Sequence, residues 1–387
     1  MPTQRPLRFH SLGLPHTVTH PDYVACAYTM KALKFSKMMA GQGHEIIHYG
    51  HEDSVLHPET EHVTVTTNDD LKKAYGNYDW RKSFFKFNQS DHAYQTFFTN
   101  AIAEIEKRKQ PHDIILPWWG SGVRPVCDAH PDLITIEPGI GYGGGHWARW
   151  KIFESYAMYH AYCGLQKVCH CNQDWYEVVI PNYFDLDEFE YQEEKEDYFL
   201  FIGRVFDGKG VNVAIETALK AGVKLKIAGQ KEDGYKLPDG VEYLGYADVE
   251  MRKKLMGGAK ACFFPSMYVE PFGGVQVESL LSGTPTLTTD WGAFAENNLH
   301  GVTGYRCRTM GDWVDATHAI LDGEISSKAC REWGENFSLE NVRPRYEKYF
   351  QDVMNVHTSK EGWYTQYHNG GTNLDVMKMK YPTVCGS

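Results

Sequence analysis

Two successive stretches of this chain repeat one pattern, in which short apolar segments alternate with longer amphipathic segments. In the first stretch, the segments typical of strands are residues 7–12, 45–49, 113–116, 133–137 and 178–181. The segments with helical spacing are residues 25–41, 93–109 and 148–165. Strands that alternate with helices predict a parallel sheet with helices on its faces. Residues 54–91 are irregular and aromatic, and we expect them to elaborate this domain rather than to join its core.

The pattern restarts after an acidic run. The strand segments of the second stretch are residues 198–202, 224–228, 241–244, 261–265 and 286–289. Its helical segments are residues 211–221, 249–257 and 274–282. We therefore predict two doubly wound α/β domains, residues 1–181 and 198–338, joined by a solvated linker at 182–197. The carboxyl ends of two facing sheets meet in one central cleft, where ligands bind in open α/β sheets.

Residues 339–387 follow the second domain. They contain a helical pattern at 339–356 and a polar tail that carries Trp363, Tyr364 and Tyr367. Aromatic residues in such a tail favour packing against the rest of the molecule. We expect this segment to return to the first domain.

Length, charge and hydropathy narrow the class of protein. A chain of 387 residues suffices for two domains with buried cores. A net charge of −11 disfavours sequence-independent binding to nucleic acid or acidic lipid. No apolar run reaches the ~20 residues of a transmembrane helix, and the N-terminus lacks the features of a signal peptide. We therefore expect a cytoplasmic protein.

The nine cysteines are scattered without a repeating spacing, as is typical of reduced thiols. Cys169, His170 and Cys171 form the one cluster that resembles half of a zinc site. Zinc sites normally bring a second, separated pair of ligands, which Cys163 does not supply. We expect these side chains to be packed structurally and predict no metal site.

The densest chemical signal is the segment Ser266-Met-Tyr-Val-Glu-Pro-Phe-Gly-Gly-Val-Gln-Val-Glu-Ser279. A strand ends just before it, and a helix is expected to begin at Gly273 and Gly274. Free N–H groups at a helix start attract phosphate, and glycine allows its close approach. Glu270 and Glu278 offer carboxylates that accept hydrogen bonds from sugar hydroxyls. Each glutamate alone is typical of a cap or a solvated residue, but their combination with the glycines indicates a ligand site.

A second signal follows the strand at 198–202, in the segment Gly203-Arg204-Val-Phe-Asp-Gly-Lys209-Gly210. Two cations on a glycine-containing loop at the end of a sheet suit a diphosphate. They would neutralise the charge that develops when a sugar–phosphate bond breaks. The alternative is an ordinary turn with two surface cations.

These motifs together resemble those of retaining glycosyltransferases of family four, which have the two-domain GT-B fold. The resemblance covers most of residues 178–310 and includes Glu270, the Glu-Pro-Phe-Gly segment, Glu278, the Arg204/Lys209 loop and Ile180-Pro-Asn-Tyr-Phe-Asp. It implies that Arg204 and Lys209 hold the donor diphosphate and that Glu278 binds the ribose hydroxyls. Glu270 would contact the transferred sugar.

The same resemblance implies further donor contacts. Phe272, Gly273 and Gly274 would lie at the phosphates, and the nucleotide base, uracil or another, would lie against Gly245 and Tyr246. Because positioning and fixed cations then do the catalytic work, we expect neither metal nor cofactor.

The first domain resembles this family only in outline. Gly13 lies where such enzymes carry a glycine loop near donor and acceptor. Glu137 ends a strand whose counterpart often ends in a histidine facing the sugar. This substitution makes Glu137, His16 and His146 candidates for contacting the sugar.

Trp118 and Trp119, with Arg124 nearby, follow the strand at 113–116 and form another candidate group. They are either core aromatics or a platform on which the acceptor stacks. The sequence does not decide between these two interpretations.

Two other motifs are more easily explained by structure. Asp185 and Asp187 have the spacing of a metal-binding Asp-x-Asp, but they lie in the predicted linker. The glycines of 139–145 resemble a dinucleotide fingerprint, yet no suitable acid follows ~20 residues later. We expect the latter to be a mobile loop lining the cleft.

The predicted reaction moves a sugar from a nucleotide sugar, expected to be UDP-linked, to an acceptor hydroxyl with retention of configuration. Pro15-His-Thr17 and the 43–50 segment also resemble, more loosely, bacteriophage glycosyltransferases, some of which modify hydroxymethylated pyrimidines in DNA. A DNA acceptor is favoured by cations interleaved with aromatic residues, namely Arg81, Lys82, Lys86, Phe84, Phe85 and Phe87. The negative net charge of the chain opposes a DNA acceptor. A glycan or small metabolite remains an equal alternative as acceptor. The rival classes are a GT-B sugar-nucleotide epimerase and a non-catalytic sugar-nucleotide-binding protein.

Overall fold

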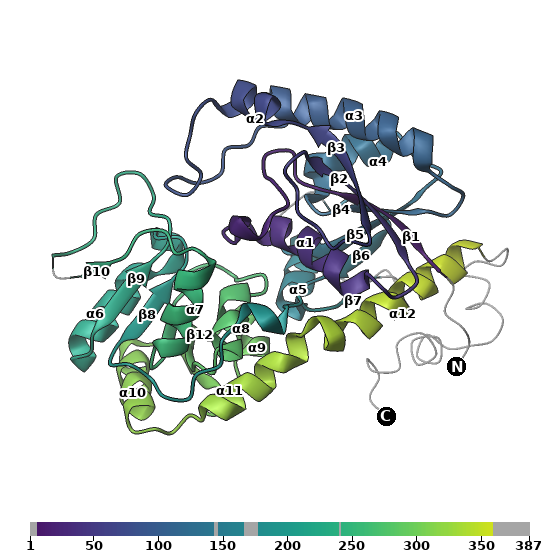
Figure 1. The fold of residues 1–387 in the computed structure, drawn as a ribbon. Helices are drawn as coiled ribbons and strands as arrows, with labels where there is room; N and C mark the ends of the chain where they lie inside the picture. Colours follow the sequence, from purple (N-terminus) through teal and green to yellow (C-terminus); the bar gives the residue numbers. More distant parts are fainter. Residues whose placement is uncertain (1–5, 143–145, 166–176, 240, 359–387) are drawn as a thin grey trace, which may run out of the picture.

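The computed structural model describes residues 6–142, 146–165, 177–239 and 241–358, which form two α/β domains side by side (Figure 1). The first domain contains a seven-stranded sheet in the order β3-β2-β1-β4-β5-β6-β7. Its strands are β1 (Arg8–Leu12), β2 (Glu45–His51), β3 (Thr60–Thr66), β4 (Ile114–Pro117), β5 (Ile134–Ile140), β6 (Trp150–Phe153) and β7 (Glu177–Val179). Its α-helices are α1 (Ala27–Met39), α2 (Asn68–Tyr75), α3 (His92–Arg108), α4 (Arg124–Asp128) and α5 (Tyr156–Leu165).

The second domain contains a six-stranded sheet in the order β10-β9-β8-β11-β12-β13. Its strands are β8 (Phe199–Ile202), β9 (Leu225–Ala228), β10 (Glu242–Tyr243), β11 (Cys262–Phe264), β12 (Thr286–Thr289) and β13 (Gly304–Cys307). The helices that follow the linker are α6 (Val211–Ala221), α7 (Val249–Gly258), α8 (Gly274–Leu281), α9 (Phe294–Asn297), α10 (Met310–Leu321), α11 (Ser327–Gly334) and α12 (Leu339–Thr358). Short 3₁₀ turns lie at Pro21–Tyr23, Gly120–Val123, Leu186–Glu188, Asp207–Lys209 and Glu335–Phe337.

All recorded strand pairs are parallel, and each sheet has a point at which the strand order reverses. In the first sheet this point lies between β1 and β4, and in the second between β8 and β11. The chains leaving two such neighbouring strands turn in opposite directions, which opens a crevice at their carboxyl ends. The loops that follow β8 and β11 carry the two motifs singled out in the sequence. The predicted doubly wound fold is confirmed.

Helix α12 crosses from the second domain back along the first, as the yellow helix in Figure 1 shows. Its buried side chains join the core of the first domain, where the Phe350 ring lies 4.9 Å from the Phe9 ring. The Tyr346 hydroxyl donates to the Pro138 carbonyl at 2.7 Å. The predicted return of this helix is therefore confirmed, whereas Trp363, Tyr364 and Tyr367 lie outside the described residues.

The prediction of one helix over 148–165 is wrong in its first half. Trp150–Phe153 forms β6, which pairs with β5 and β7, and the helix begins only at Tyr156. All four residues of β6 are buried. A strand covered on both faces has no alternating pattern, so a short apolar run of this kind cannot be distinguished from the end of a helix.

The interpretation of 54–91 as an elaboration is also wrong in part. Thr60–Thr66 forms β3, the edge strand of the first sheet, and its Val63 and Val65 join a buried cluster. Residues 76–91 are irregular, as expected. The predicted loop at 139–145 begins inside β5, which extends to Ile140, and residues 143–145 lie outside the described part.

The sequence also predicts no metal site and no transmembrane helix. Cys169, His170 and Cys171 lie outside the described residues. Within the described ranges, no group of three or more His, Cys, Asp or Glu side chains is placed to hold a metal ion. None of the described helices is long and apolar enough to cross a bilayer.

Candidate active site

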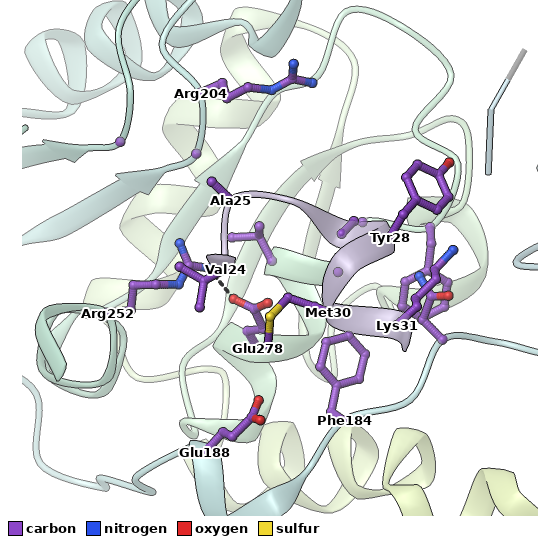
Figure 2. Close-up of a pocket in the computed structure, with 18 of the residues that line it drawn as sticks. Val24, Ala25, Tyr28, Met30, Lys31, Phe184, Glu188, Arg204, Arg252 and Glu278 are labelled. Carbon is purple, nitrogen blue, oxygen red and sulfur yellow. Dashed lines mark hydrogen bonds and ion pairs between the residues drawn. The ribbon is translucent and has the colours of Figure 1, made fainter. Parts of the chain in front are cut away.

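A cavity of about 430 Å³ lies between the two domains, within the range of small-molecule sites. Its first-domain wall is formed by α1 and by the chain segments around Glu154 and Asn182, and its second-domain wall by the loops after β8 and β11 and by α7 and α8. Figure 2 shows the side chains of both walls directed toward the same space. Among the described residues, the second-domain wall carries four cations and two carboxylates, which are Arg204, Lys209, Arg252, Lys253, Glu270 and Glu278.

The N-terminus of α8 opens onto this cavity. Gly273 precedes the helix with a φ of 78°, and a Cβ atom there would lie 2.5 Å from the Phe294 ring. A larger residue is therefore excluded by both conformation and space. No side chain caps the first N–H groups of α8. Gly273 and Gly274 both line the cavity, so these N–H groups face the cavity without a side-chain partner, as binding of an anion requires.

Lys209 and Glu270 lie next to this helix start and are bound to each other. The Lys209 ammonium lies 2.8 Å from the Glu270 carboxylate, which also accepts from the Ser266 hydroxyl at 2.7 Å. The Lys209 ammonium also lies 5.0 Å from the centre of the Tyr268 ring. Burial lowers the pKa of Lys209, but Glu270 and Tyr268 more than offset it, so the net pKa is raised. Lys209 is therefore a fixed cation at neutral pH.

Glu278 lies on α8 and forms an ion pair with Arg252 of α7, marked by the dashed line in Figure 2. Both side chains are largely buried and both line the cavity. Arg252 is a cavity residue that the sequence interpretation missed. It looked like one more polar residue of a predicted helix, and only the packing of α7 beside α8 reveals its partner.

Arg204 is the most exposed of the cavity cations. Its guanidinium lies 5.4 Å from the Phe206 ring centre and 5.4 Å from that of Phe84, a first-domain residue. Stacking between two rings is typical of arginine and holds its planar group at the cavity edge.

The irregular segment 76–91 makes further contacts with the second domain. The Gln230 side chain donates to the Ser83 carbonyl at 3.3 Å and to the Trp80 carbonyl. Tyr246 lines the cavity, and its ring lies 5.8 Å from the Trp80 ring. Gly245 occupies the preceding turn with a φ of 75°. The segment predicted to bind the nucleotide base is thus in contact with the other domain.

The first-domain wall carries a polar group that the sequence interpretation did not identify. Lys31 forms an ion pair with Glu154 and donates to the Gly139 carbonyl at 3.1 Å. Asn182 donates to the other oxygen of the Glu154 carboxylate at 3.1 Å. Burial lowers the pKa of Lys31 well below its ordinary value. One turn further along α1, the Lys34 ammonium lies 3.3 Å from the Glu188 carboxylate.

Glu137 and His146 do not line this cavity. Glu137 is fully buried and accepts from the Tyr142 hydroxyl at 2.7 Å and from the backbone N–H groups of Trp147 and Ala148. Burial raises the pKa of Glu137. His146 packs against the Tyr162 ring at 4.2 Å, and burial lowers its pKa to about 4. In this structure the Glu137 carboxylate is therefore occupied by Tyr142, Trp147 and Ala148.

His16 is buried beside Tyr94, whose hydroxyl lies 2.9 Å from its Nδ1, and it also contacts Trp119. Burial lowers the pKa of His16 to about 3. Trp118 is a core residue, with its indole N–H donating to the Ser11 hydroxyl at 2.9 Å. Gly13 donates its N–H to the Tyr49 carbonyl at 2.8 Å. None of these candidates, His16, Trp118, Trp119 and Gly13, is among the residues that line the cavity.

Asp185 and Asp187 lie at the 3₁₀ turn of the linker. The Asp185 carboxylate accepts from the Lys37 ammonium at 2.7 Å and from the Asp187 N–H at 3.1 Å. This is the geometry of a capping residue, in agreement with the interpretation of these residues as part of the linker.

Comparison with known proteins shows what the second-domain part of this chain is similar to. Residues 184–338 match the family model of glycosyl transferases group 1. An uncharacterised glycosyltransferase of Methanocaldococcus jannaschii is 30% identical over 178 residues, which is 41% of this chain and 43% of that protein. Glycogen synthase of Mycobacterium tuberculosis is 31% identical over 145 residues, 33% of this chain and 35% of that protein. The chain thus spans less than half the length of these curated relatives.

Solved structures show a similar fold over almost the whole chain. AviGT4, a glycosyltransferase involved in avilamycin A biosynthesis, matches with a TM-score of 0.63 and 20% identity, over 90% of this chain and 98% of that chain. HepE of Anabaena, in complex with UDP and glucose, matches with a TM-score of 0.60 and 14% identity, over 88% and 98%. The two facing domains are those of the GT-B fold.

Proposed function

We propose that this chain is a glycosyltransferase that moves a sugar from a nucleoside diphosphate to an acceptor hydroxyl. The observation that carries the proposal is the second-domain wall of the cavity. There, four cations and two carboxylates surround the uncapped start of α8, within the region that matches glycosyl transferases group 1. A surplus of positive charge beside free N–H groups complements a diphosphate anion.

Apart from Lys253, the charged residues of this wall each have a role in the proposed donor complex. Lys209, Arg204 and the N-terminus of α8 bind the diphosphate. Glu278, positioned by Arg252, accepts from the ribose hydroxyls, and Glu270 binds the transferred sugar. Tyr246 and Phe272 line the same space, Tyr246 on the side of the nucleotide base. We take UDP as the nucleotide, because a protein with the same fold is seen in complex with UDP.

In the proposed reaction, the bond between the anomeric carbon and the diphosphate oxygen breaks, and its electron pair stays on the diphosphate. The acceptor oxygen bonds to the anomeric carbon from the same face, which retains the configuration. The acceptor proton passes to the departing phosphate. Lys209 and Arg204 stabilise the charge that grows there, so neither a metal nor a cofactor is needed.

A screen of nucleotide sugars by thermal shift tests this proposal, since a ligand that binds only the folded state raises the melting temperature. The ligands that stabilise the protein are then incubated with mixed acceptors, and nucleoside diphosphate release and glycoside formation are measured together. Nucleoside diphosphate and an altered free sugar without any acceptor product would indicate an epimerase. Stabilisation without turnover under any condition would indicate a non-catalytic binder.

A further inference from the structure

The first-domain wall of the cavity contains two buried lysines that the proposed donor site does not use. Lys31 and Lys34, at successive turns of α1, are only 5% and 6% exposed. Lys31 contacts Glu154, and Lys34 contacts Glu188. Buried ion pairs are costly, and well-packed apolar residues of similar volume often stabilise a protein at least as well. Stability alone therefore does not require charge at this position, and because these pairs line the cavity, they are available to a ligand.

The hydrogen-bonding capacity of this wall is only partly used. Among the described residues, the Lys31 ammonium has two polar partners for three N–H groups, the Glu154 carboxylate and the Gly139 carbonyl. The Glu154 carboxylate receives Lys31 on one oxygen and Asn182 on the other, and each oxygen can accept a further bond. Donors and acceptors thus lie side by side at the cavity surface, as neighbouring hydroxyl groups require.

The two walls differ in charge. On the second-domain wall, cations outnumber carboxylates, whereas on the first-domain wall each lysine is matched by one glutamate. A wall without net charge does not favour an acceptor with many phosphates, because such an acceptor is bound by unpaired lysine and arginine residues. The wall instead fits a neutral ligand with several hydroxyl groups.

The position of this group relates it to the reacting end of the donor. Ser155 follows Glu154 directly, and its hydroxyl donates to the Pro271 carbonyl at 2.5 Å. Pro271 is the neighbour of Glu270, the residue assigned to the transferred sugar. The residue next to Glu154 is therefore hydrogen-bonded to the loop that the proposed function assigns to the donor sugar. Apolar surface from Tyr28, Met30 and Phe184 adjoins it, as Figure 2 shows.

We propose that Lys31 and Glu154, the latter positioned by Asn182, bind neighbouring hydroxyl groups of a neutral carbohydrate acceptor. This inference rests on the proposed glycosyltransferase function and names its acceptor class. Lys31 donates to one hydroxyl oxygen, Glu154 accepts from the next hydroxyl, and Asn182 holds the carboxylate in place. The rings of Tyr28 and Phe184 pack against the C–H groups of the sugar.

The experiment compares Glu154→Gln and Asn182→Ala with the unaltered chain and with Glu177→Gln. Glu177 is the matched control, because it forms another buried lysine pair, with Lys151 at 3.1 Å, that does not line the cavity. The acceptors are methyl glucosides, methyl galactosides, maltose, duplex DNA with hydroxymethylcytosine, and diacylglycerol in phosphatidylcholine vesicles. Melting temperature and nucleoside diphosphate affinity are recorded for every variant.

We expect transfer to at least one neutral glycoside, with the acceptor KM raised about 10-fold or more in both cavity variants. The Kd for nucleoside diphosphate should change less than about twofold, and Glu177→Gln should leave both constants unaltered. Asn182→Ala keeps the Lys31–Glu154 pair, so it remains informative if Glu154→Gln does not fold.

Transfer to DNA or diacylglycerol alone would overturn the inference and leave the proposed function standing. An unaltered acceptor KM in both variants, or an equal loss of nucleoside diphosphate affinity, would also overturn it. Failure of the unaltered chain to bind any nucleotide sugar would instead refute the proposed function, and the inference with it.

Discussion

Lys209 and Glu270 bind each other at 2.8 Å, so the cation and the carboxylate assigned to different ends of the donor are partners without it. The second carboxylate, Glu278, is likewise occupied by Arg252. In the proposed donor complex, these residues therefore exchange internal contacts for ligand contacts. Such an exchange keeps the buried charges paired in both states, which avoids the penalty of an unpaired ion in a partly buried site.

The first prediction concerns the division of the donor between the two glutamates. Glu278→Gln should weaken nucleotide sugar and free nucleoside diphosphate alike, by roughly 10- to 150-fold, because the ribose is common to both. Glu270→Gln should lower turnover but leave nucleoside diphosphate affinity nearly unchanged. Calorimetry with nucleoside diphosphate and steady-state rates measure the two effects.

Both substitutions conserve volume and change only charge, so altered packing does not confound the comparison. Equal weakening of nucleoside diphosphate by the two variants would mean that the glutamates do not divide the donor. Because Glu278→Gln also leaves Arg252 without its ion pair, Arg252→Gln should reproduce part of its effect on the ribose.

The second prediction concerns the cations. Lys209→Ala and Arg204→Ala should lower kcat by roughly 10²- to 10³-fold, because the proposed function assigns both residues to charge that grows in the transition state. Affinity for the free nucleoside should change little. Arg204→Lys should restore activity only in part, since an ammonium cannot reproduce the planar stack between Phe84 and Phe206. Equal loss of nucleoside monophosphate and diphosphate binding would contradict the assignment.

The third prediction is that turnover persists in excess chelator. Fixed cations occupy the cavity, and Asp185 of the metal-like Asp-x-Asp is bound to Lys37 at 2.7 Å. The measurement is the steady-state rate with and without EDTA. A rate that is lost in EDTA and recovered with manganese or magnesium would make Asp185 and Asp187 candidate ligands.

The fourth prediction concerns acid stability. Burial lowers the pKa of His16 to about 3, against about 6.5 in an unfolded chain. Between these values the unfolded state binds a proton that the folded state excludes, so stability falls as pH falls from about 6.5 toward 3. His16 alone should cost about 2 kcal/mol on going from pH 7.5 to pH 5.

Urea unfolding of His16→Phe at both pH values tests this expectation, and the exposed His160→Gln serves as control. The Phe variant should lose less stability on acidification than the unaltered chain, even though it also loses the contact with the Tyr94 hydroxyl. An unchanged pH dependence would show that His16 is not the group that titrates.

The fifth prediction concerns α12. Phe350 is fully buried against the first domain, so Phe350→Ala should lower the free energy of unfolding by about 3–5 kcal/mol. Asn355→Ala, at an exposed position of the same helix, should stay within about 0.5 kcal/mol. Chemical denaturation followed by tryptophan fluorescence measures both, and similar small effects would show that α12 contributes little to this core.

The sequence predicted residues of the second-domain wall of the cavity better than those of the first-domain wall, for a physical reason. Glu270, Glu278, Arg204 and Lys209 lie in loops or on α8 within one domain, close in sequence to the glycines that mark those loops and the helix start. The structure places all four on one cavity. Lys31, by contrast, belongs to a helix with ordinary amphipathic spacing, and its partner Glu154 is distant in the sequence. No local pattern reveals such a pair.

The wrong predictions of the fold also concern residues whose environment depends on segments distant in the sequence. Trp150–Phe153 is buried on both faces, so it lacks the period that identifies a strand, and its neighbours β5 and β7 were needed to recognise it. The sequence pattern puts Glu137 at the end of a strand, whereas β5 continues to Ile140. Its bonds to the Trp147 and Ala148 N–H groups depend on a loop conformation that composition does not specify. The helix at 339–356 was recognised because one apolar face continues over its whole length.

Because α12 returns to the first domain, it determines when the core of that domain can be completed during synthesis of the protein. The core around Phe9 and Phe35 receives Tyr346 and Phe350 from a helix encoded after the entire second domain. While the chain emerges from the ribosome, the first domain is therefore left with an uncovered apolar face until the second has been made. The first domain is thus synthesised first but completes its core only after the second domain has been made. A chain whose synthesis stopped before α12 would expose this apolar face.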